Sequence, residues 1–266
     1  MRIAIYQGQG QSADTQKNLD IMRRVAIEAA GRGARLVIFP EMFLTGYNIG
    51  DAVFELAEVQ DGTSAQKVSQ IARDAQIALL YGYPEQFETR IFNSAILIDS
   101  EGKALANCRK THLYGAEENR LFSRGDALTL AELEGLNIGI LVCYDVEFPE
   151  TVRALSLAGA DFIAVPTALM QPYCMIARIV VPARAYESQV AIAYVNRCGC
   201  EGSLTYCGLS CIVGPDGEDL QRAGPDETLL ITSIDHAMIE AVRKENPILD
   251  DRRPDLYQGS IGRGLS

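Results

Sequence analysis

Short apolar runs alternate with helix-like segments along this chain, and this alternation restricts the possible folds more than any other feature. Buried strands are expected at residues 3–7, 35–40, 77–82, 136–142, 161–166, 190–196, 209–213 and 229–234. Helices are expected at 14–31, 64–75, 149–158, 176–188 and 235–244, with Pro182 as a kink or a start in the fourth. Strands that are separated by helices predict an α/β fold.

Hairpins are expected beside these strand–helix units. The strands at 92–99 and 104–108 flank the turn sequence SEGK at 100–103, and a second turn, GPDG, lies at 214–217. Connections of both kinds predict mixed sheets, and two such sheets with helices outside would bury both faces of each sheet. No linker-like break interrupts the sequence, so we expect one domain over residues 1–266. Residues from about 246 to 266 are expected to form an extended tail.

The composition argues against several classes of protein. A chain of 266 residues, 48% of them hydrophobic, can bury one large core. The net charge of −11 argues against nucleic-acid binding, because a phosphate-binding face needs clustered Lys and Arg. No apolar run approaches the roughly 18 residues of a membrane span, and the N-terminal sequence is typical of a strand rather than a signal peptide. We therefore expect a cytoplasmic protein that binds neither nucleic acid nor membrane.

Seven cysteines, an odd number, lie at positions 108, 143, 174, 198, 200, 207 and 211. Several of them lie inside apolar strand-like runs, which favours free core or interface thiols in a reducing compartment over a disulfide framework. The spacings of Cys198 with Cys200 and of Cys207 with Cys211 are compatible with metal binding. However, the chain has only two histidines, and neither is near these cysteines, so no metal site is expected.

Cys143 stands out among these cysteines because of its position. It follows the apolar strand at 136–142 and precedes Pro149 and Glu150, which suit the first turn of a helix. A thiol between a strand end and a helix is held on a sharp turn and exposed above the sheet, as in a nucleophile elbow, and a nearby helix N-terminus or cation would favour its thiolate. The alternative is an ordinary buried cysteine.

Two further reactive groups follow apolar strands. Glu41 comes directly after the strand at 35–40, and Lys110 follows the strand at 104–108. Strand C-terminal ends in α/β sheets gather at one edge, so these groups and Cys143 are expected to converge. The glutamate can take the thiol proton and return it to a leaving amine. Lys110 and the backbone N–H of Tyr144 can stabilise an oxyanion.

Five stretches together resemble the nitrilase superfamily of carbon–nitrogen hydrolases. Those around the three reactive groups are FPEMFLTGY, CRKTHLYGAEE and LVCYDVEFPE, and the others are GADFIAVPTA and PARAYESQVAIAYVN. They are ordered and spaced as in that family, and the resemblance extends over nearly the whole chain to about residue 235.

This resemblance implies a fold, a catalytic apparatus and an assembly. The implied fold is a four-layer α-β-β-α sandwich with two mixed sheets, which pairs into a homodimer or a higher even oligomer. The implied triad is Glu41, Lys110 and Cys143, with no metal or organic cofactor. Many members carry a second glutamate near the Cys–Lys pair. Glu118 matches that position, and Glu117 is the competing choice.

The substrate is less constrained by the sequence. The features MRIAIYQG, EMFLTGYNIG and TYCGLS resemble the short bacterial aliphatic amidases, including 5-aminopentanamidase. We therefore expect a cysteine-dependent amidase that converts a small aliphatic amide, such as an ω-amino amide, into a carboxylic acid and ammonia through a thioester. The alternatives are an N-carbamoyl amine amidohydrolase, an ω-amidase, a nitrilase, or a non-metabolic interaction protein.

Glu147 gives the one hint about the substrate tail. Many ω-amidase-like members have Arg at this position and act on substrates with a carboxylate tail, so a glutamate suits a cationic amine. The alternative is a structural pair with Arg153 or Arg184. Other candidates for substrate binding lie beside strand ends or motif loops, with ordinary packing as the alternative, and they are Tyr47, Tyr114, Tyr144, Thr167 and Tyr173. His112 is expected to orient the lysine loop rather than to catalyse.

Overall fold

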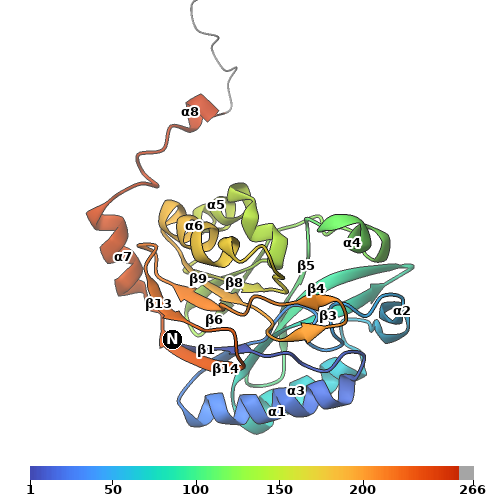
Figure 1. Ribbon diagram of the computed structural model, residues 1–266. Coiled ribbons are helices and arrows are strands. Elements are labelled where there is room, and N and C mark those ends of the chain that lie inside the picture. The colour runs from blue at the N-terminus through green and yellow to red at the C-terminus, as the bar shows by residue number, and fades with distance from the viewer. Residues whose placement is uncertain (258–266) are drawn as a thin grey trace, which may run out of the picture.

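The protein contains two six-stranded sheets packed face to face, with helices on the outer side of each (Figure 1). The coordinates are those of a computed structural model, which describes residues 1–257. Together the four layers form an α-β-β-α sandwich, so the predicted fold class is confirmed.

The first sheet has the strand order β14-β1-β2-β3-β4-β5. Its strands are β14 (Thr228–Ser233), β1 (Arg2–Gln7), β2 (Leu36–Ile38), β3 (Ala78–Phe87), β4 (Arg90–Ile98) and β5 (Ala104–Arg109). Strands β1, β2 and β3 are parallel, while β14, β4 and β5 pair antiparallel with their neighbours. Since β5 is two antiparallel steps from β3, it runs in the same direction as β2, and the two strands end at the same edge of the sheet.

The second sheet has the order β13-β12-β9-β8-β7-β6. Its strands are β13 (Asp219–Arg222), β12 (Cys211–Val213), β9 (Ala191–Val195), β8 (Phe162–Pro166), β7 (Leu136–Ile140) and β6 (Thr129–Leu133). Strands β7, β8 and β9 are parallel, flanked by antiparallel strands on both sides. Outside both sheets, β10 (Cys200–Glu201) and β11 (Leu204–Thr205) form a short hairpin.

Three apolar layers hold the sandwich together. One lies between the two sheets and contains residues such as Ile5 and Ile138. A second joins the first sheet to α1 (Thr15–Gly31) and α3 (Thr63–Ala75), and a third joins the second sheet to α5 (Pro149–Leu157) and α6 (Val181–Ser188). Helix α1 buries one apolar stripe that includes Met22, and Asp14 caps it by accepting a hydrogen bond from the Lys17 N–H.

The structure departs from the expected elements in several places. Two short helices, α2 (Ala52–Leu56) and α4 (Gly115–Leu121), and the edge strands β6 and β13 were not expected. The expected helix at 176–188 is divided into a π-helical turn at Ile176–Val180 and α6, with Pro182 in the first turn of α6. A proline suits that position because its missing N–H needs no partner there.

The chain leaves the sandwich at its C-terminal end. Helix α7 (His236–Glu245) follows β14, and the short helix α8 (Pro254–Tyr257) lies away from the sheets in Figure 1. Thus the first part of the predicted tail contains one short helix rather than being wholly extended. Residues 258–266 of that predicted tail lie outside the described residues.

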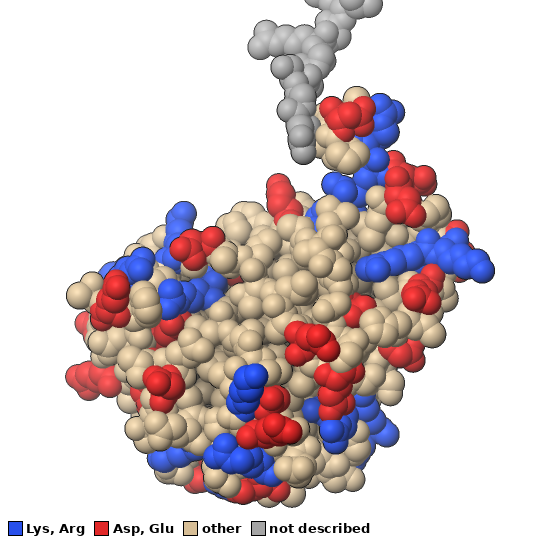
Figure 2. Space-filling model, turned by 180° about the vertical axis from the view of Figure 1, so that it is seen from behind, with Lys and Arg blue, Asp and Glu red and all other residues tan. Residues whose placement is uncertain are grey.

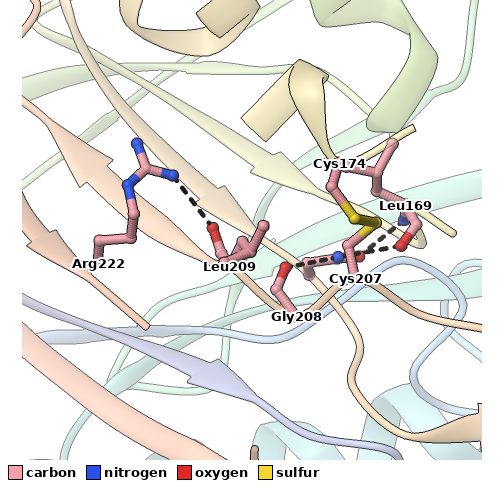
Figure 3. Close-up of a disulfide and its surroundings, with 7 residues drawn as sticks. Leu169, Cys174, Cys207, Gly208, Leu209 and Arg222 are labelled. Atoms are coloured by element: carbon pink, nitrogen blue, oxygen red, sulfur yellow. Dashed lines mark hydrogen bonds between the residues drawn. A yellow bond between two sulfur atoms is a disulfide. The ribbon is translucent and has the colours of Figure 1, made fainter. Parts of the chain in front are cut away.

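A disulfide joins Cys174 to Cys207, so the expectation of free thiols is wrong for this pair (Figure 3). The two residues are 33 positions apart in sequence, but their Cα atoms are 5.7 Å apart. They meet because the segment after β8 packs beside the one before β12, where the Cys207 N–H donates to the Leu169 carbonyl at 2.9 Å. Such a meeting depends on tertiary packing, which cysteine spacing does not reveal.

Charged side chains of both signs are interspersed on the face seen in Figure 2, without a single basic patch. Among the described residues, no helix has the length and apolar character needed to cross a membrane.

Candidate active site

Glu41 lies just past the end of β2, on a buried turn that crosses the first sheet. The turn passes over β3 at Gly82, whose carbonyl accepts a hydrogen bond from the Leu44 N–H at 3.1 Å. A Cβ on Gly82 would lie 2.3 Å from the Met42 nitrogen, so only glycine permits this approach. The crossing carries the Glu41 carboxylate from β2 toward β4 and β5.

Lys110 directly follows β5, and its ammonium joins two glutamates. The buried Nζ donates to Glu41 Oε1 and to Glu118 Oε1, each at 2.7 Å. Asn93 on β4 lies between the two strand ends. Its side chain donates to Glu41 Oε1 at 2.7 Å, and its carbonyl accepts from the Lys110 N–H at 2.8 Å. Asn93 therefore fixes the carboxylate and the lysine backbone together.

The structure separates the two candidates for the second glutamate. Glu118 of α4 is buried, and besides Lys110 it accepts hydrogen bonds from the Tyr47 hydroxyl and the Tyr114 N–H, both at 2.7 Å. Glu117, one position earlier, is exposed and pairs with Arg120 at 2.6 Å. A step of one residue on a helix turns a side chain by about 100°, which places only Glu118 beside Lys110.

Cys143 occupies the predicted sharp turn beyond β7. It begins a 3-10 turn at Cys143–Glu147 and has φ of +48°, a left-handed conformation that is uncommon for a residue other than glycine. Asp145 stabilises the turn by accepting from the Val142 N–H at 3.2 Å and from the His112 N–H at 2.8 Å. It also accepts from the Thr111 hydroxyl at 2.7 Å, so one buried carboxylate ties the cysteine turn to the lysine loop.

The electrostatics of the site favour an uncharged thiol beside a poised base. Burial raises the pKa of Glu41, although Lys110 opposes this shift. Burial alone would lower the pKa of Lys110, but Glu41, Glu118 and the Cys143 sulfur outweigh it and hold the ammonium charged. Burial and Glu41 raise the pKa of the Cys143 thiol above its ordinary value. The expected thiolate-favouring environment is therefore not found, and deprotonation requires a base.

The Glu41 carboxylate has the chemistry and the free oxygen that such a base needs. Its Oε1 is occupied by Lys110 and Asn93, but its buried Oε2 has no hydrogen-bond partner among residues 1–257. A buried carboxylate oxygen without a partner is costly unless a ligand completes it. The arrangement leaves one basic oxygen for the thiol or for a bound substrate.

A small pocket of about 160 Å³ opens above Cys143. This volume is below the range of roughly 300–1,000 Å³ that is typical of drug-sized ligands, and it favours a small substrate. Its wall is aromatic and apolar, apart from the cysteine and one carboxylate, and consists of Tyr47, Tyr114, Tyr144, Glu147, Ala168, Leu169, Met170, Tyr173 and Ile176.

Glu147 is that carboxylate. Among the described residues it makes no ion pair within 4.0 Å, so the predicted alternative of a structural pair with Arg153 or Arg184 is not found. Arg184 instead donates to the backbone carbonyl of Glu147 at 2.8 Å and pairs with Glu187 at 3.0 Å. Burial raises the pKa of Glu147, although the positive charges of Lys110 and Arg184 oppose this shift.

The other predicted binding residues have different places. Tyr47, Tyr114 and Tyr144 line the pocket, and the rings of Tyr114 and Tyr144 meet edge to face with centroids 5.3 Å apart. Thr167 is fully buried and does not line the pocket; its carbonyl accepts from the Glu41 N–H at 3.3 Å. His112 stacks on Phe148 at 3.8 Å and hydrogen-bonds Asp145, as expected for a residue that orients the loop.

Sequence reasoning missed Asn93 and Asp145, which position the reactive groups. Asp145 falls within the CYDVEFPE stretch, so its nearness to Cys143 was a signal. Asn93 gave none, because it lies inside the expected strand at 92–99, where polar residues normally face solvent.

Comparisons with known proteins place the chain in one family. Residues 2–244 match the family model described as carbon-nitrogen hydrolase. A Pseudomonas protegens protein described as the hydrolase in the pqqF 5' region is 48% identical over 260 residues, or 97% of this chain and 90% of the relative. An (R)-stereoselective amidase from Pseudomonas sp. is 37% identical over 254 residues, covering 95% of this chain and 92% of its own.

Solved structures agree with the sequence relatives. An amidase of the nitrilase superfamily from Nesterenkonia AN1 superimposes with a TM-score of 0.88 at 36% identity, covering 97% of this chain and 96% of its own. A mutant of that amidase carries the acetamide moiety of fluoroacetamide covalently added at the active-site cysteine.

The chain belongs to the carbon–nitrogen hydrolase family, within the nitrilase superfamily and among its amidases. It is a hydrolase that acts on carbon–nitrogen bonds other than peptide bonds.

Proposed function

We propose that this protein is a cysteine-dependent amidase that hydrolyses a small aliphatic ω-amino amide, with 5-aminopentanamide as the model substrate. The observation that carries the proposal is the buried cluster in which Lys110 joins Glu41 and Glu118, Glu41 keeps one carboxylate oxygen without a partner, and the charges of Glu41 and Lys110 act on the Cys143 thiol. A structural ion pair alone would not need an acceptor left open in a buried site.

The first half of the reaction forms a thioester. Glu41 takes the Cys143 proton as the sulfur attacks the amide carbonyl, and a carbon–sulfur bond forms. The Lys110 ammonium and the Tyr144 N–H stabilise the resulting oxyanion. Glu41 then gives its proton to the amide nitrogen, the carbon–nitrogen bond breaks, and ammonia leaves.

The second half hydrolyses the thioester. Glu41 takes a proton from water, the hydroxide attacks the carbonyl carbon, and the tetrahedral species collapses with release of the sulfur. The proton on Glu41 returns to Cys143, which restores the neutral thiol favoured by its raised pKa. Glu118 holds Lys110 in place throughout and accepts the Tyr47 hydroxyl.

The residues of the pocket wall favour a substrate with a cationic tail. Glu147 supplies a carboxylate that makes no ion pair within 4.0 Å among residues 1–257, and Tyr114, Tyr144 and Tyr173 supply ring faces and edges around the same small space. A carboxylate among aromatic rings is a favourable environment for an organic ammonium group. A neutral aliphatic tail would leave the half-buried Glu147 without a partner.

The test is ammonia release from a panel of substrates. The panel holds 5-aminopentanamide, its uncharged counterpart hexanamide, 2-oxoglutaramate, N-carbamoylputrescine and propionitrile. We expect 5-aminopentanamide to give the highest kcat/KM, and Glu147→Gln to lower that value about tenfold or more without affecting hexanamide. Glu150→Gln, which removes an exposed carboxylate outside the pocket, serves as the matched control.

Other outcomes have defined meanings. Equal rates for 5-aminopentanamide and hexanamide would reject the cationic tail and leave a general aliphatic amidase. Fastest hydrolysis of the nitrile, the carbamoyl compound or the keto-acid amide would replace the proposal with the corresponding activity.

A further inference from the structure

A buried arginine from the second sheet holds the turn that carries Glu41. Arg197 follows β9, and its side chain has no exposed surface. Its Nη1 donates to the carbonyls of Glu41 and Met42 at 3.3 and 3.4 Å, and its Nη2 donates to the carbonyl of Gln9. The guanidinium therefore contacts the backbone of Glu41 rather than the Glu41 carboxylate.

A buried glutamate holds the other end of the same turn. Glu201, on β10, pairs with Arg197 at 3.5 Å. Its carboxylate accepts the Tyr47 N–H at 3.1 Å and the Asn48 N–H at 2.9 Å, and its backbone carbonyl accepts the Asn48 side chain at 2.9 Å. Close packing reinforces these contacts, since a Cβ on Gly46 would lie 2.5 Å from Glu201 Oε1.

We propose that Arg197 and Glu201 are positioning residues for catalysis, which clamp residues 41–48 so that Glu41 and the Tyr47 hydroxyl stay on opposite sides of the Lys110–Glu118 pair. Arg197 binds backbone carbonyls at the start of the segment, and Glu201 binds backbone N–H groups at its end. Neither residue lines the pocket above Cys143.

Both ends of the clamp lead to reacting groups by short paths. Glu41 contacts Lys110 directly, and the Tyr47 hydroxyl donates to Glu118 at 2.7 Å. A buried ion pair is weak evidence for stability alone, because desolvation offsets much of its attraction. Catalysis needs the Glu41 carboxylate to be placed within a fraction of an ångström, and this positioning accounts for a buried ion pair whose desolvation is costly.

The experiment compares Glu201→Gln with Glu58→Gln in the full chain. Glu58 is a half-buried carboxylate that accepts the Ser64 N–H at 2.7 Å and the Ser64 hydroxyl at 2.6 Å, and it does not contact residues 41–48. We expect Glu201→Gln to lower kcat at least about tenfold with a smaller change in KM, because Tyr47 is the one pocket residue within 41–48 and the rest of the pocket wall does not contact Glu201. Glu58→Gln is expected to lower Tm while kcat stays within about twofold.

Two pH measurements separate positioning from stability. If the clamp is lost, Glu41 moves away from Lys110 and Asn93, which lower its pKa, so the acidic limb of the kcat/KM profile moves to higher pH. Glu41 raises the pKa of Cys143, so loss of the clamp lowers the pH midpoint for iodoacetamide alkylation of Cys143, followed by mass spectrometry. The alkylation readout requires no substrate.

The outcomes distinguish this inference from the proposed function, on which its catalytic meaning rests. A parent enzyme without amidase activity rejects the function, while the alkylation midpoint still tests the clamp. If Glu201→Gln folds and keeps the parental kcat and alkylation midpoint, the clamp proposal is overturned. If Glu201→Gln does not fold, Gly46→Ala is measured instead, because its added Cβ crowds the Glu201 carboxylate while Arg197 and Glu201 both keep their charges. Parental kcat and alkylation midpoint in Gly46→Ala would overturn the clamp proposal in the same way.

Discussion

Replacing Gly82 by alanine should displace the Glu41 turn without removing any reactive group. The added Cβ would lie 2.3 Å from the Met42 nitrogen and 2.9 Å from the Glu41 Cα, against about 3.4 Å for ordinary contact. The backbone must therefore move by roughly 1 Å. A misplacement of that size costs about 100-fold in rate, equivalent to about 2.7 kcal/mol of transition-state stabilisation.

The assay is steady-state kcat/KM for ammonia release, with Tm measured in parallel. Overpacking should cost about 1–3 kcal/mol of folding stability, a decrease in Tm of roughly 2–12 °C. Gly139→Ala on β7 is the matched control, because its Cβ would meet the flexible side chains of Leu155 and Ile163 at 3.0 and 3.1 Å. A Gly82→Ala enzyme with the parental kcat/KM would refute the claim that this crossing positions the base.

Two further predictions concern the partners of the reactive groups. Asn93→Ala removes a hydrogen bond that lowers the pKa of Glu41. This pKa should therefore rise, and the acidic limb of the pH–rate profile should move to higher pH. An acidic limb at the parental pH would show that this hydrogen bond does not set the pKa of Glu41. Glu118→Gln should lower kcat about 100-fold, because Lys110 loses one of its two carboxylates, while Glu117→Gln should stay within about twofold. Equal effects of the two glutamine variants on kcat would remove Glu118 from the site.

The fold follows largely from the hydrophobic pattern, and the elements that this pattern failed to predict are all short. The parallel strands β1, β7, β8 and β9 are buried on both faces, and their continuous apolar sequences predict them well. The edge strands β6 and β13 alternate partly buried and exposed residues over only five and four positions, too short and too weak a pattern to identify. Helix α4 is seven residues long and mostly polar, so it too lacks a clear signal.

The site was predictable where it depends on strand ends and unpredictable where it depends on packing. Glu41, Lys110 and Cys143 each follow a strand, and their meeting follows from strand direction. The choice of Glu118 over Glu117 required the phase of α4 relative to Lys110. Longer-range features left no local pattern, and they include the carbonyl contacts of Arg197 and the bond between Cys174 and Cys207.

In the proposed reaction, turnover passes through a thioester on Cys143. The most direct measurement mixes enzyme with 5-aminopentanamide, quenches in acid within the first turnovers, and determines the mass of the Cys143 peptide. We expect a 5-aminopentanoyl adduct on Cys143 in the parent enzyme, and neither adduct nor ammonia release in Cys143→Ala. Ammonia release by Cys143→Ala at the parental rate would contradict it.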